Sequence, residues 1–478
     1  MTAAVLACGD GVGAETTFSD DVIIVDELCR HPEAIANHVQ STDRLVLVLH
    51  PDGFSLVNLQ TQLRAAGFDP LGVPIVDHAA VTEHPDGARV VLAGARARAI
   101  EYAGSQPEQA KPVFPDRMTR RSLLTFPKPE YVAVPSVDHG VCAAGDGCAA
   151  CVSVCPKQAY QIVGGRVLYD KSVCEPCGRC VTACPAGAIQ NPVVTPAVMR
   201  GQVEALVAAA SAPLGIAYVC TRRTAGSLWR PPWFEVEVPC TGMLTATWLL
   251  APLLMGASAV TGVPCSDSGC PLGHDPILGD RVAFARELLL SCGLDPLLVA
   301  ATPAEDVPGR PLPVIDLEDP FGVHGGSEVI LGLAASGTET VTPSVQHGGS
   351  PVGVIEIDPE SCTLCGSCAH VCPTEALTFR QDPGELSLLF DAARCTACGQ
   401  CVPGCPERHR GAISLDRAVD VRALGRGAET LHAAATLQCE SCGAPIASAS
   451  MMDRIAALLG DDHSAAMSYV TRFCIDCR

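Results

Sequence analysis

Aromatic and basic residues are scarce in this 478-residue chain. Aromatic side chains make up only 4% of it, and 32 Lys and Arg stand against 52 Asp and Glu, for a formal net charge of −20. So few aromatic rings provide little surface on which sugars or nucleotide bases could stack. An acidic surface repels polyphosphate, so these two shortages argue against a nucleic-acid partner.

Signals for export and for membrane insertion are also lacking. Residues 1–13 contain neither a charged leader region nor a long apolar segment. The stretch 239–266 has no charged residue, but prolines, glycines and cysteines interrupt it. We therefore expect an apolar helix over 244–255 and a buried strand over 259–263, rather than the alternative of a membrane span, and a cytoplasmic location.

Cysteine, in contrast, is abundant. The chain has 27 cysteines, an odd number that does not suit a framework of disulfides in a cytoplasmic protein. Thiols that bind metal are the better interpretation. The length predicts several domains, and stretches rich in proline (104–130) or in Pro, Gly, Ser and Thr (303–350) mark two linkers between them.

Two cysteine-rich units repeat one another along the chain. In the second unit, the runs that begin at Cys362 and Cys395 both read C-x2-C-x2-C-x3-C-P. In the first unit, the run from Cys174 is regular, whereas Cys142 and Cys148 are separated by five residues instead of two. This is the spacing of bacterial dicluster ferredoxins, in which the fourth cysteine of each run ligates the other cluster.

The spacing predicts four [4Fe–4S] clusters. Their expected ligands are Cys362, Cys365, Cys368 and Cys405; Cys395, Cys398, Cys401 and Cys372; Cys174, Cys177, Cys180 and Cys155; and Cys142, Cys148, Cys151 and Cys184. For the last set, which contains the stretched run, a three-iron or altered cluster is the alternative. Paired zinc knuckles do not fit these runs. Between the two runs of the second unit we expect a hairpin, with strands at 376–379 and 386–390.

Four further cysteines lie between the repeats, at the ends of apolar segments. They are Cys220, Cys240, Cys265 and Cys270. The carboxyl ends of parallel strands meet at one edge of a sheet, so these thiols are expected to lie close together. Four thiolates suffice for one [2Fe–2S] cluster. The alternative is a group of small, buried cysteines without metal, which is also our interpretation of Cys292.

Two resemblances extend this interpretation. Residues 239–243, 256–260 and 265–273 resemble the delta subunit of methyl-viologen-reducing hydrogenase, a family that passes electrons through a [2Fe–2S] cluster to heterodisulfide reductase. The order of the N-terminal segment, with residues 46–50, 63–70 and 76–78, is similar to the N-terminal region of the flavin-binding subunit of heterodisulfide reductase, which carries cysteines for a further cluster. This chain keeps only Cys8 and Cys29, with His50 where a cysteine is expected. The resemblance therefore implies a docking domain without a cluster. Independently, the alternation of short apolar segments with helical stretches predicts strands at 22–25, 45–49 and 90–92.

Near the end of the chain, two CxxC knuckles flank a segment whose residues 452–459 are expected to form a helix. The knuckles consist of Cys439, Cys442, Cys474 and Cys477. Two such knuckles present four sulfurs tetrahedrally, which predicts a structural zinc ribbon. A fifth [4Fe–4S] cluster and a redox dithiol pair are the alternatives.

The expected fold is therefore multidomain α/β and α+β. Two dicluster ferredoxin-like domains (131–197 and 351–420) flank an α/β domain similar to the hydrogenase delta subunit (198–302), with an N-terminal α/β domain (1–103) and a zinc-ribbon-like segment (421–478).

No nucleophile–base set, flavin fingerprint, or nickel or molybdenum signature is present, so no catalytic residue is assigned. We expect an electron-transfer subunit whose partners are other subunits of a redox complex, such as a flavoprotein, a hydrogenase, a dehydrogenase or a heterodisulfide reductase. A disulfide- or quinone-reducing enzyme and a metal-stabilised scaffold are the alternatives.

Overall fold

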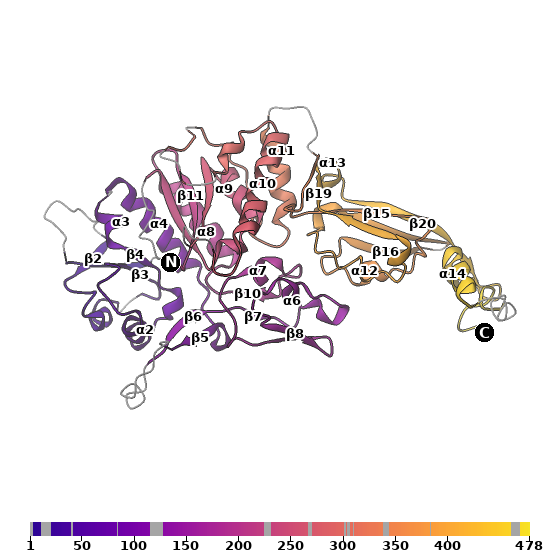
Figure 1. Cartoon of the computed structure of the whole chain (residues 1–478), viewed down its shortest axis with the longest axis horizontal. Coiled ribbons are helices and arrows are strands. Elements are labelled where there is room, and N and C mark those ends of the chain that lie inside the picture. Colours follow the sequence, from indigo (N-terminus) through magenta and orange to yellow (C-terminus); the bar gives the residue numbers. More distant parts are fainter. Residues whose placement is uncertain are drawn as a thin grey trace.

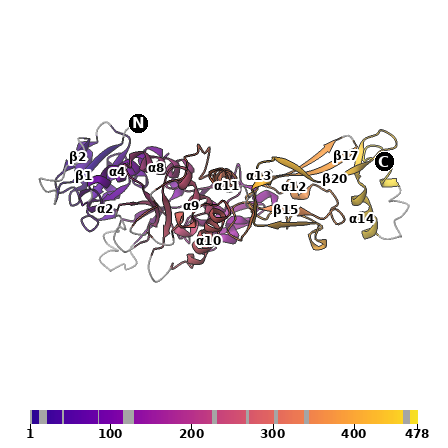
Figure 2. The ribbon, with the colours of Figure 1, turned by 90° about the horizontal axis from the view of Figure 1, so that it is seen from above.

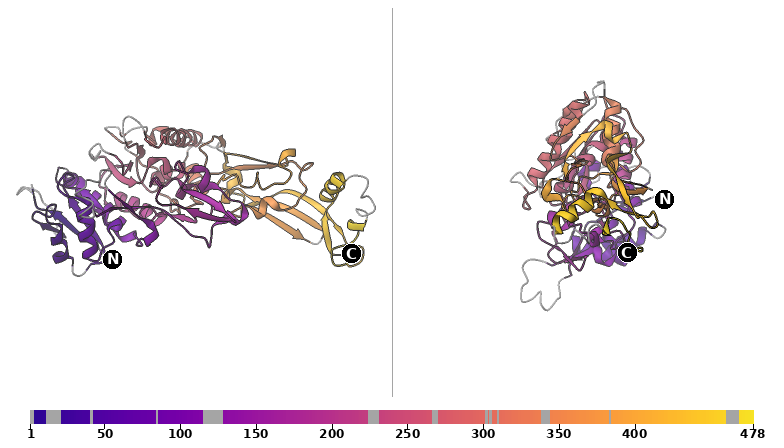
Figure 3. Two further views of the ribbon diagram at one scale, coloured as in Figure 1. Left: turned by 60° about the horizontal axis from the view of Figure 1, so that its bottom comes forward. Right: turned by 90° about the vertical axis from the view of Figure 1, so that its right-hand side faces the viewer.

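The computed structural model shows an elongated molecule whose N-terminal domain and C-terminal segment lie at opposite ends (Figures 1 and 2). It describes residues 3–10, 21–39, 42–83, 85–114, 128–223, 231–265, 270–300, 303, 306–308, 310–337, 344–382, 384–459 and 469–478. Figure 3 shows the same separation of the two ends from another side. The architecture is mixed α/β, with several small sheets instead of one large one.

The N-terminal domain is built on a parallel four-stranded sheet in the order β2-β1-β3-β4. Its strands are β1 (Ala4–Cys8), β2 (Val22–Val25), β3 (Leu45–Leu49) and β4 (Ile75–Asp77). Every residue of β3 is buried, as a parallel strand covered on both faces requires. The main helices are α2 (Leu56–Ala65), α3 (His78–Thr82) and α4 (Pro85–Glu101).

The strand expected at 90–92 was wrong, because these residues lie inside helix α4. Val90, Leu92, Ala95 and Ala99 are all buried. An apolar run as short as Val90–Leu92 fits a strand and a helix equally well by its pattern. The alanines that flank it favour the helix, and they belong to a segment much longer than a strand of this sheet.

The first ferredoxin-like unit consists of short elements around its cysteines. The preceding linker forms an antiparallel pair, β5 (Ala110–Val113) with β6 (Glu130–Ala133). Within the unit, β7 (Ser136–Val137) pairs with β10 (Ile189–Gln190), and β8 (Tyr160–Val163) with β9 (Arg166–Tyr169). Two single-turn helices lie within the cysteine runs, α6 (Ala150–Val154) and α7 (Arg179–Ala183), and each contains the third cysteine of its run.

The central domain has a parallel three-stranded sheet in the order β12-β11-β13. Its strands are β11 (Gly215–Cys220), β12 (Trp233–Val238) and β13 (Ala259–Val263), and its helices include α8 (Pro196–Ala209), α9 (Ala246–Leu254) and α10 (Asp275–Ser291). The uncharged stretch 239–266 thus supplies the buried helix α9 and the buried strand β13. In the part of the chain that the structure describes, no helix is long and apolar enough to cross a membrane.

The segment 303–350, expected to be a linker, contains a further helix of the central domain. This helix, α11 (Gly325–Ser336), packs against α9. Val329, Ile330 and Leu333 are fully buried and recur at the spacing of one helix face. The glycines and serines around them made this segment resemble a loop, although its apolar residues are numerous enough to bury.

The second ferredoxin-like unit shares a sheet with the C-terminal segment. Strands β15 (Val354–Ile357) and β18 (Ile413–Asp416) pair with each other. The expected hairpin is formed by β16 (Leu377–Asp382) and β17 (Glu385–Asp391). Pro383, in the turn of this hairpin, lies outside the described residues. Strand β17 also pairs with the long β20 (Ala428–Gln438), which pairs with β21 (Pro445–Ser448). Helix α12 (Ser367–His370) lies within the first run and contains Cys368, and α14 (Ala449–Leu459) follows β21.

The domains pack closely against one another. Helices α4 and α8 cross where Gly94 faces Leu206, and a Cβ atom on Gly94 would come within 2.7 Å of the Leu206 side chain. The Arg98 guanidinium is 2.7 Å from the Glu237 carboxylate across the same interface. One buried apolar cluster continues from the N-terminal sheet through the central domain into the second ferredoxin-like unit.

Candidate metal centres

In the second ferredoxin-like unit, the fourth cysteine of each run lies with the first three of the other run. Burial raises the pKa of Cys368 to about 12, and Cys362, Cys365 and Cys405 add to the rise. Burial likewise raises the pKa of Cys401 to about 12, with contributions from Cys395, Cys398 and Cys372. Thiols that perturb each other's pKa in this way lie near one another. The structure therefore brings together the two ligand sets that the spacing predicts.

The first unit has the same crossed arrangement. Burial raises the pKa of Cys180 to about 12, and Cys177, Cys174 and Cys155 contribute. Burial raises the pKa of Cys151 to about 11, and Cys148, Cys184 and Cys142 contribute. The stretched run thus keeps Cys142 beside its expected partners.

The extra residues of the stretched run form a compact turn. Ala143–Asp146 is a short 3-10 helix, and the amide of Cys148 donates to the carbonyl of Ala143 at 3.1 Å. Gly147 ends the turn with a φ of +94°, a conformation that glycine adopts without strain. Asp146, within this turn, is 3.7 Å from the His370 imidazole of the second unit. The insertion therefore also contributes to the contact between the two units.

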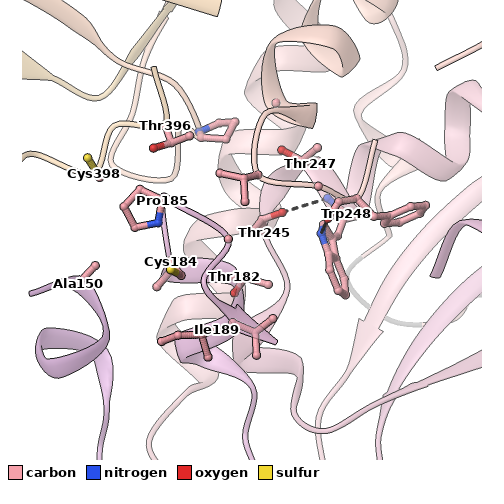
Figure 4. Close-up of a pocket in the computed structure, with 18 of the residues that line it drawn as sticks. Ala150, Thr182, Cys184, Pro185, Ile189, Thr245, Thr247, Trp248, Thr396 and Cys398 are labelled. Atoms are coloured by element: carbon pink, nitrogen blue, oxygen red, sulfur yellow. Dashed lines mark hydrogen bonds between the residues drawn. The ribbon is translucent and has the colours of Figure 1, made fainter. Parts of the chain in front are cut away.

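The two ferredoxin-like units face each other through their cysteines. After burial and Cys184, Cys398 of the other unit raises the pKa of Cys148. Cys184 and Cys398 line one cavity of about 440 Å³, together with Thr396 and Trp248 (Figure 4). The cysteine set of the second unit that contains Cys398 therefore neighbours the set of the first unit that contains Cys148 and Cys184.

The central cysteines meet at the carboxyl edge of their sheet. Cys220 ends β11, Cys240 follows β12 and Cys265 follows β13, and these three are buried in one group with Cys177 of the first unit. Cys270 packs against this group, while residues 266–269 lie outside the described part. A hydrogen bond from Cys240 lowers the pKa of Cys220 to about 6. The backbone amide of Gly242 donates to the Cys240 sulfur at 3.4 Å.

The first unit packs tightly against this central site. The Thr182 hydroxyl donates to the carbonyl of Met243 at 2.7 Å. Gly178, which follows Cys177, has a φ of +75°, and a Cβ atom there would lie 2.6 Å from the Met243 sulfur. Arg222 of the central domain forms an ion pair with Glu175, and this pair lowers the pKa of the Glu175 carboxyl. These contacts hold Cys177 beside the central thiols.

His274 is a residue of this site that the sequence analysis missed. It is buried, and its Nδ1 lies 3.3 Å from the Cys240 sulfur. The ligand atoms of Cys240, Cys270 and His274 all lie within 4.8 Å of one another. Burial lowers the pKa of His274 to about 4, so the imidazole is neutral at pH 7. The C-x3-H spacing from Cys270 to His274 was the signal that could have indicated it.

The four C-terminal knuckle cysteines also meet. The sulfurs of Cys439, Cys442, Cys474 and Cys477 lie within 4.8 Å of one another. A bidentate ion pair joins the two knuckles, with Arg472 nitrogens 2.7 and 2.6 Å from the Glu440 carboxylate oxygens. The amide of Cys474 donates to Cys439 and lowers the pKa of Cys439 to about 6. A closed set of four thiolates suits a tetrahedral metal ion.

One hydrogen bond to sulfur gives a direct test of the first unit. The buried Tyr160 hydroxyl donates to the Cys180 sulfur at 3.3 Å. Such bonds stabilise the more negative, reduced form of a cluster and raise its potential. We expect Tyr160→Phe to lower the reduction potential of the centre assigned to Cys174, Cys177, Cys180 and Cys155 by about 20 to 60 mV, the equivalent of one ordinary hydrogen bond. A redox titration followed by electron paramagnetic resonance measures this shift, and equal shifts in all centres would contradict it.

Comparisons with known proteins agree with the cysteine pattern. Residues 355–378 and 166–189 match two family models that are both described as a 4Fe-4S binding domain. An uncharacterized ferredoxin of Methanocaldococcus jannaschii is 34% identical over 56 residues, which cover 12% of this chain and 89% of that protein. A ferredoxin of Methanothermococcus thermolithotrophicus is 38% identical over 55 residues, or 11% of this chain and 90% of that protein. The chain therefore belongs to the ferredoxins, as a larger protein with two ferredoxin-type 4Fe–4S domains.

Proposed function

We propose that this protein is the electron-relay subunit of a multisubunit oxidoreductase and passes single electrons along a row of iron–sulfur centres. The observation that carries this proposal is that each thiol set lies beside the next. Each set is named here by its first cysteine. The row runs from the Cys362 set to the Cys395 set, then to the Cys142 set, the Cys174 set and the central cysteines. Cys398 beside Cys148 and Cys177 beside Cys240 join its parts.

The donor sets fit the clusters that we assign to them. Each ferredoxin set offers four thiols, and the central group offers Cys220, Cys240, Cys265 and Cys270 for a [2Fe–2S] cluster. When bound, each such cluster accepts and donates one electron at a time. The chain's own part is to hold them in sequence, to bury them from water and to donate hydrogen bonds to their sulfurs, as Tyr160 and the amide of Gly242 do.

The partners in this proposal are other subunits of a redox complex. The resemblances to the flavin-binding subunit of heterodisulfide reductase and to the hydrogenase delta subunit support a heterodisulfide reductase-, hydrogenase- or formate dehydrogenase-like assembly. The central site would then exchange electrons with one partner and the Cys362 set, at the other end of the row, with another. A purified native complex with its cofactors analysed would identify both.

Iron content and magnetic coupling test the row. With four cubanes and one two-iron cluster, the protein should hold about 18 irons; eight or fewer would eliminate the relay.

Reduced clusters that are neighbours broaden each other's electron paramagnetic resonance spectra. We expect the central signal to sharpen in the Cys174→Ser/Cys180→Ser variant, which lacks the adjacent centre. It should keep its width in the matched Cys362→Ser/Cys365→Ser variant, which lacks the farthest one. The opposite result would refute the proposed order.

For the C-terminal knuckles we propose one structural zinc ion. A cut after Leu437 leaves most of strand β20 paired with β17. It removes the knuckles together with β21 and α14, and it keeps the other three strands of the sheet. We expect this deletion to lower the zinc content by about one ion per chain and to leave the cluster potentials unchanged, because closed tetrahedral zinc has no redox role. Elemental analysis of the full and shortened chains decides this. A loss of iron and sulfide in place of zinc would make the knuckles a further cluster site.

A further inference from the structure

A second kind of metal-ligating group lies at the carboxyl edge of the N-terminal sheet. Cys8 is the last residue of β1, His50 directly follows β3, and Cys29 lies in the turn after β2. The Sγ atoms of the two cysteines and a ring nitrogen of His50 all lie within 4.8 Å of one another. Both cysteines are buried, and His50 is half-buried. These residues belong to three separate segments that the parallel topology brings to one place.

The surroundings hold these side chains in position. The Cys29 sulfur is 3.5 Å from Nδ1 of His50 and accepts the backbone amide of the same residue at 3.3 Å. The loop after His50 folds back so closely that a Cβ atom on Gly53 would lie 2.9 Å from the Cys29 Cβ. The His50 ring is stacked on that of the buried His78, with centroids 4.0 Å apart. An amide directed at a thiolate and a ring fixed by stacking are features of a prepared ligand set.

We propose that Cys8, Cys29 and His50 bind one Zn²⁺ ion. Two thiolates and one imidazole are the ligand types that zinc prefers, and they are too few for a cluster that takes four cysteines. Three protein ligands leave one tetrahedral position for water or a small exogenous ligand. The carboxyl edge of a parallel sheet is also where α/β folds place their ligands. The ion would tie together the loops that follow β1, β2 and β3.

This site is separate from the relay, and zinc content tests it in the full-length protein. We expect Cys8→Ser, Cys29→Ser and His50→Ala each to lower the zinc content by about one ion per chain with the iron content unchanged. The matched control is Cys292→Ser, which also replaces a buried cysteine but one that belongs to no such group among the residues that the structure describes. Because each variant is compared with the unaltered protein, zinc at the C-terminal knuckles does not affect the difference. Equal zinc content in all four variants would overturn the proposal.

A second measurement avoids the risk that a variant does not fold. In the unaltered protein, mass spectrometry after thiol alkylation should find Cys8 and Cys29 protected, and a zinc chelator should expose both to the reagent at least tenfold faster. Cys292 should react at the same rate with and without the chelator. A disulfide between Cys8 and Cys29 in the native protein, or labelling that the chelator does not change, would refute the zinc site.

Discussion

Replacing Cys240 or Cys265 with serine should abolish the [2Fe–2S] signal of the reduced protein while the [4Fe–4S] signals persist. Both sulfurs belong to the buried group at the carboxyl edge of the central sheet, and of the cysteines that we assign to cubanes, this group includes Cys177 alone. Of about 18 irons, each variant should therefore lose about two. Electron paramagnetic resonance and iron analysis of the anaerobically purified variants measure both effects.

Cys292→Ser is the control for this experiment. Cys292 is buried at the end of α10 in the same domain, and it lies outside the group of central thiols. Its replacement should leave both the spectrum and the iron content unchanged. If the spectrum also remains unchanged in the Cys240 and Cys265 variants, the central cysteines are buried thiols without a cluster.

Gly178→Ala should separate the first ferredoxin-type domain from the central site. The new Cβ atom would lie 2.6 Å from the sulfur of Met243 and would adopt a φ of +75°. The left-handed conformation costs about 1 kcal/mol for a residue with a Cβ, and the end of the Met243 side chain must also move to relieve the overlap. We expect a lower unfolding temperature and a weaker magnetic coupling between the central signal and that of the Cys174 set.

The chain contains a matched control for this substitution. Gly399 occupies the same place in the corresponding cysteine run, between Cys398 and Gln400, and has a φ of +77°. A Cβ atom at Gly399 would meet no atom within 4 Å. Gly399→Ala should therefore show only the conformational cost. Equal losses of stability in the two variants, with the coupling preserved in both, would mean that the contact with Met243 does not hold the domains together.

The parts of this protein that follow local patterns could be predicted from the sequence. The ferredoxin spacing is rigid enough that the chain alone indicated which thiols would meet, including the exchange of Cys372 and Cys405 between runs. The strand ends at Cys220, Cys240 and Cys265 were predictable for the same reason, because parallel strands place their carboxyl ends at one edge.

The remaining features depend on contacts between distant segments. Strand β20 extends the β16–β17 hairpin by pairing with β17, and no local sequence pattern in 428–438 indicates that pairing. Helix α11 is stabilised by burial against α9, in a segment whose glycines and serines resemble a loop. His50 stands in the sequence at a position where a cysteine is expected, and His274 follows Cys270 at a C-x3-H spacing, but their proximity to Cys8, Cys29 and Cys240 depends on the fold.

The order of the cysteine groups along the chain differs from their order in the proposed row. The first ferredoxin-type domain precedes the central domain in sequence, yet in the row its thiols lie between the central thiols and those of the second ferredoxin-type domain. On the ribosome, the middle and one end of the row are therefore synthesised before the other end exists. Cys184 and Cys398 line the same cavity, and Cys398 is synthesised more than 200 residues after Cys184. If the proposed row is correct, we expect oxygen to reach the centre that includes Cys184 more easily in the nascent chain than in the finished molecule.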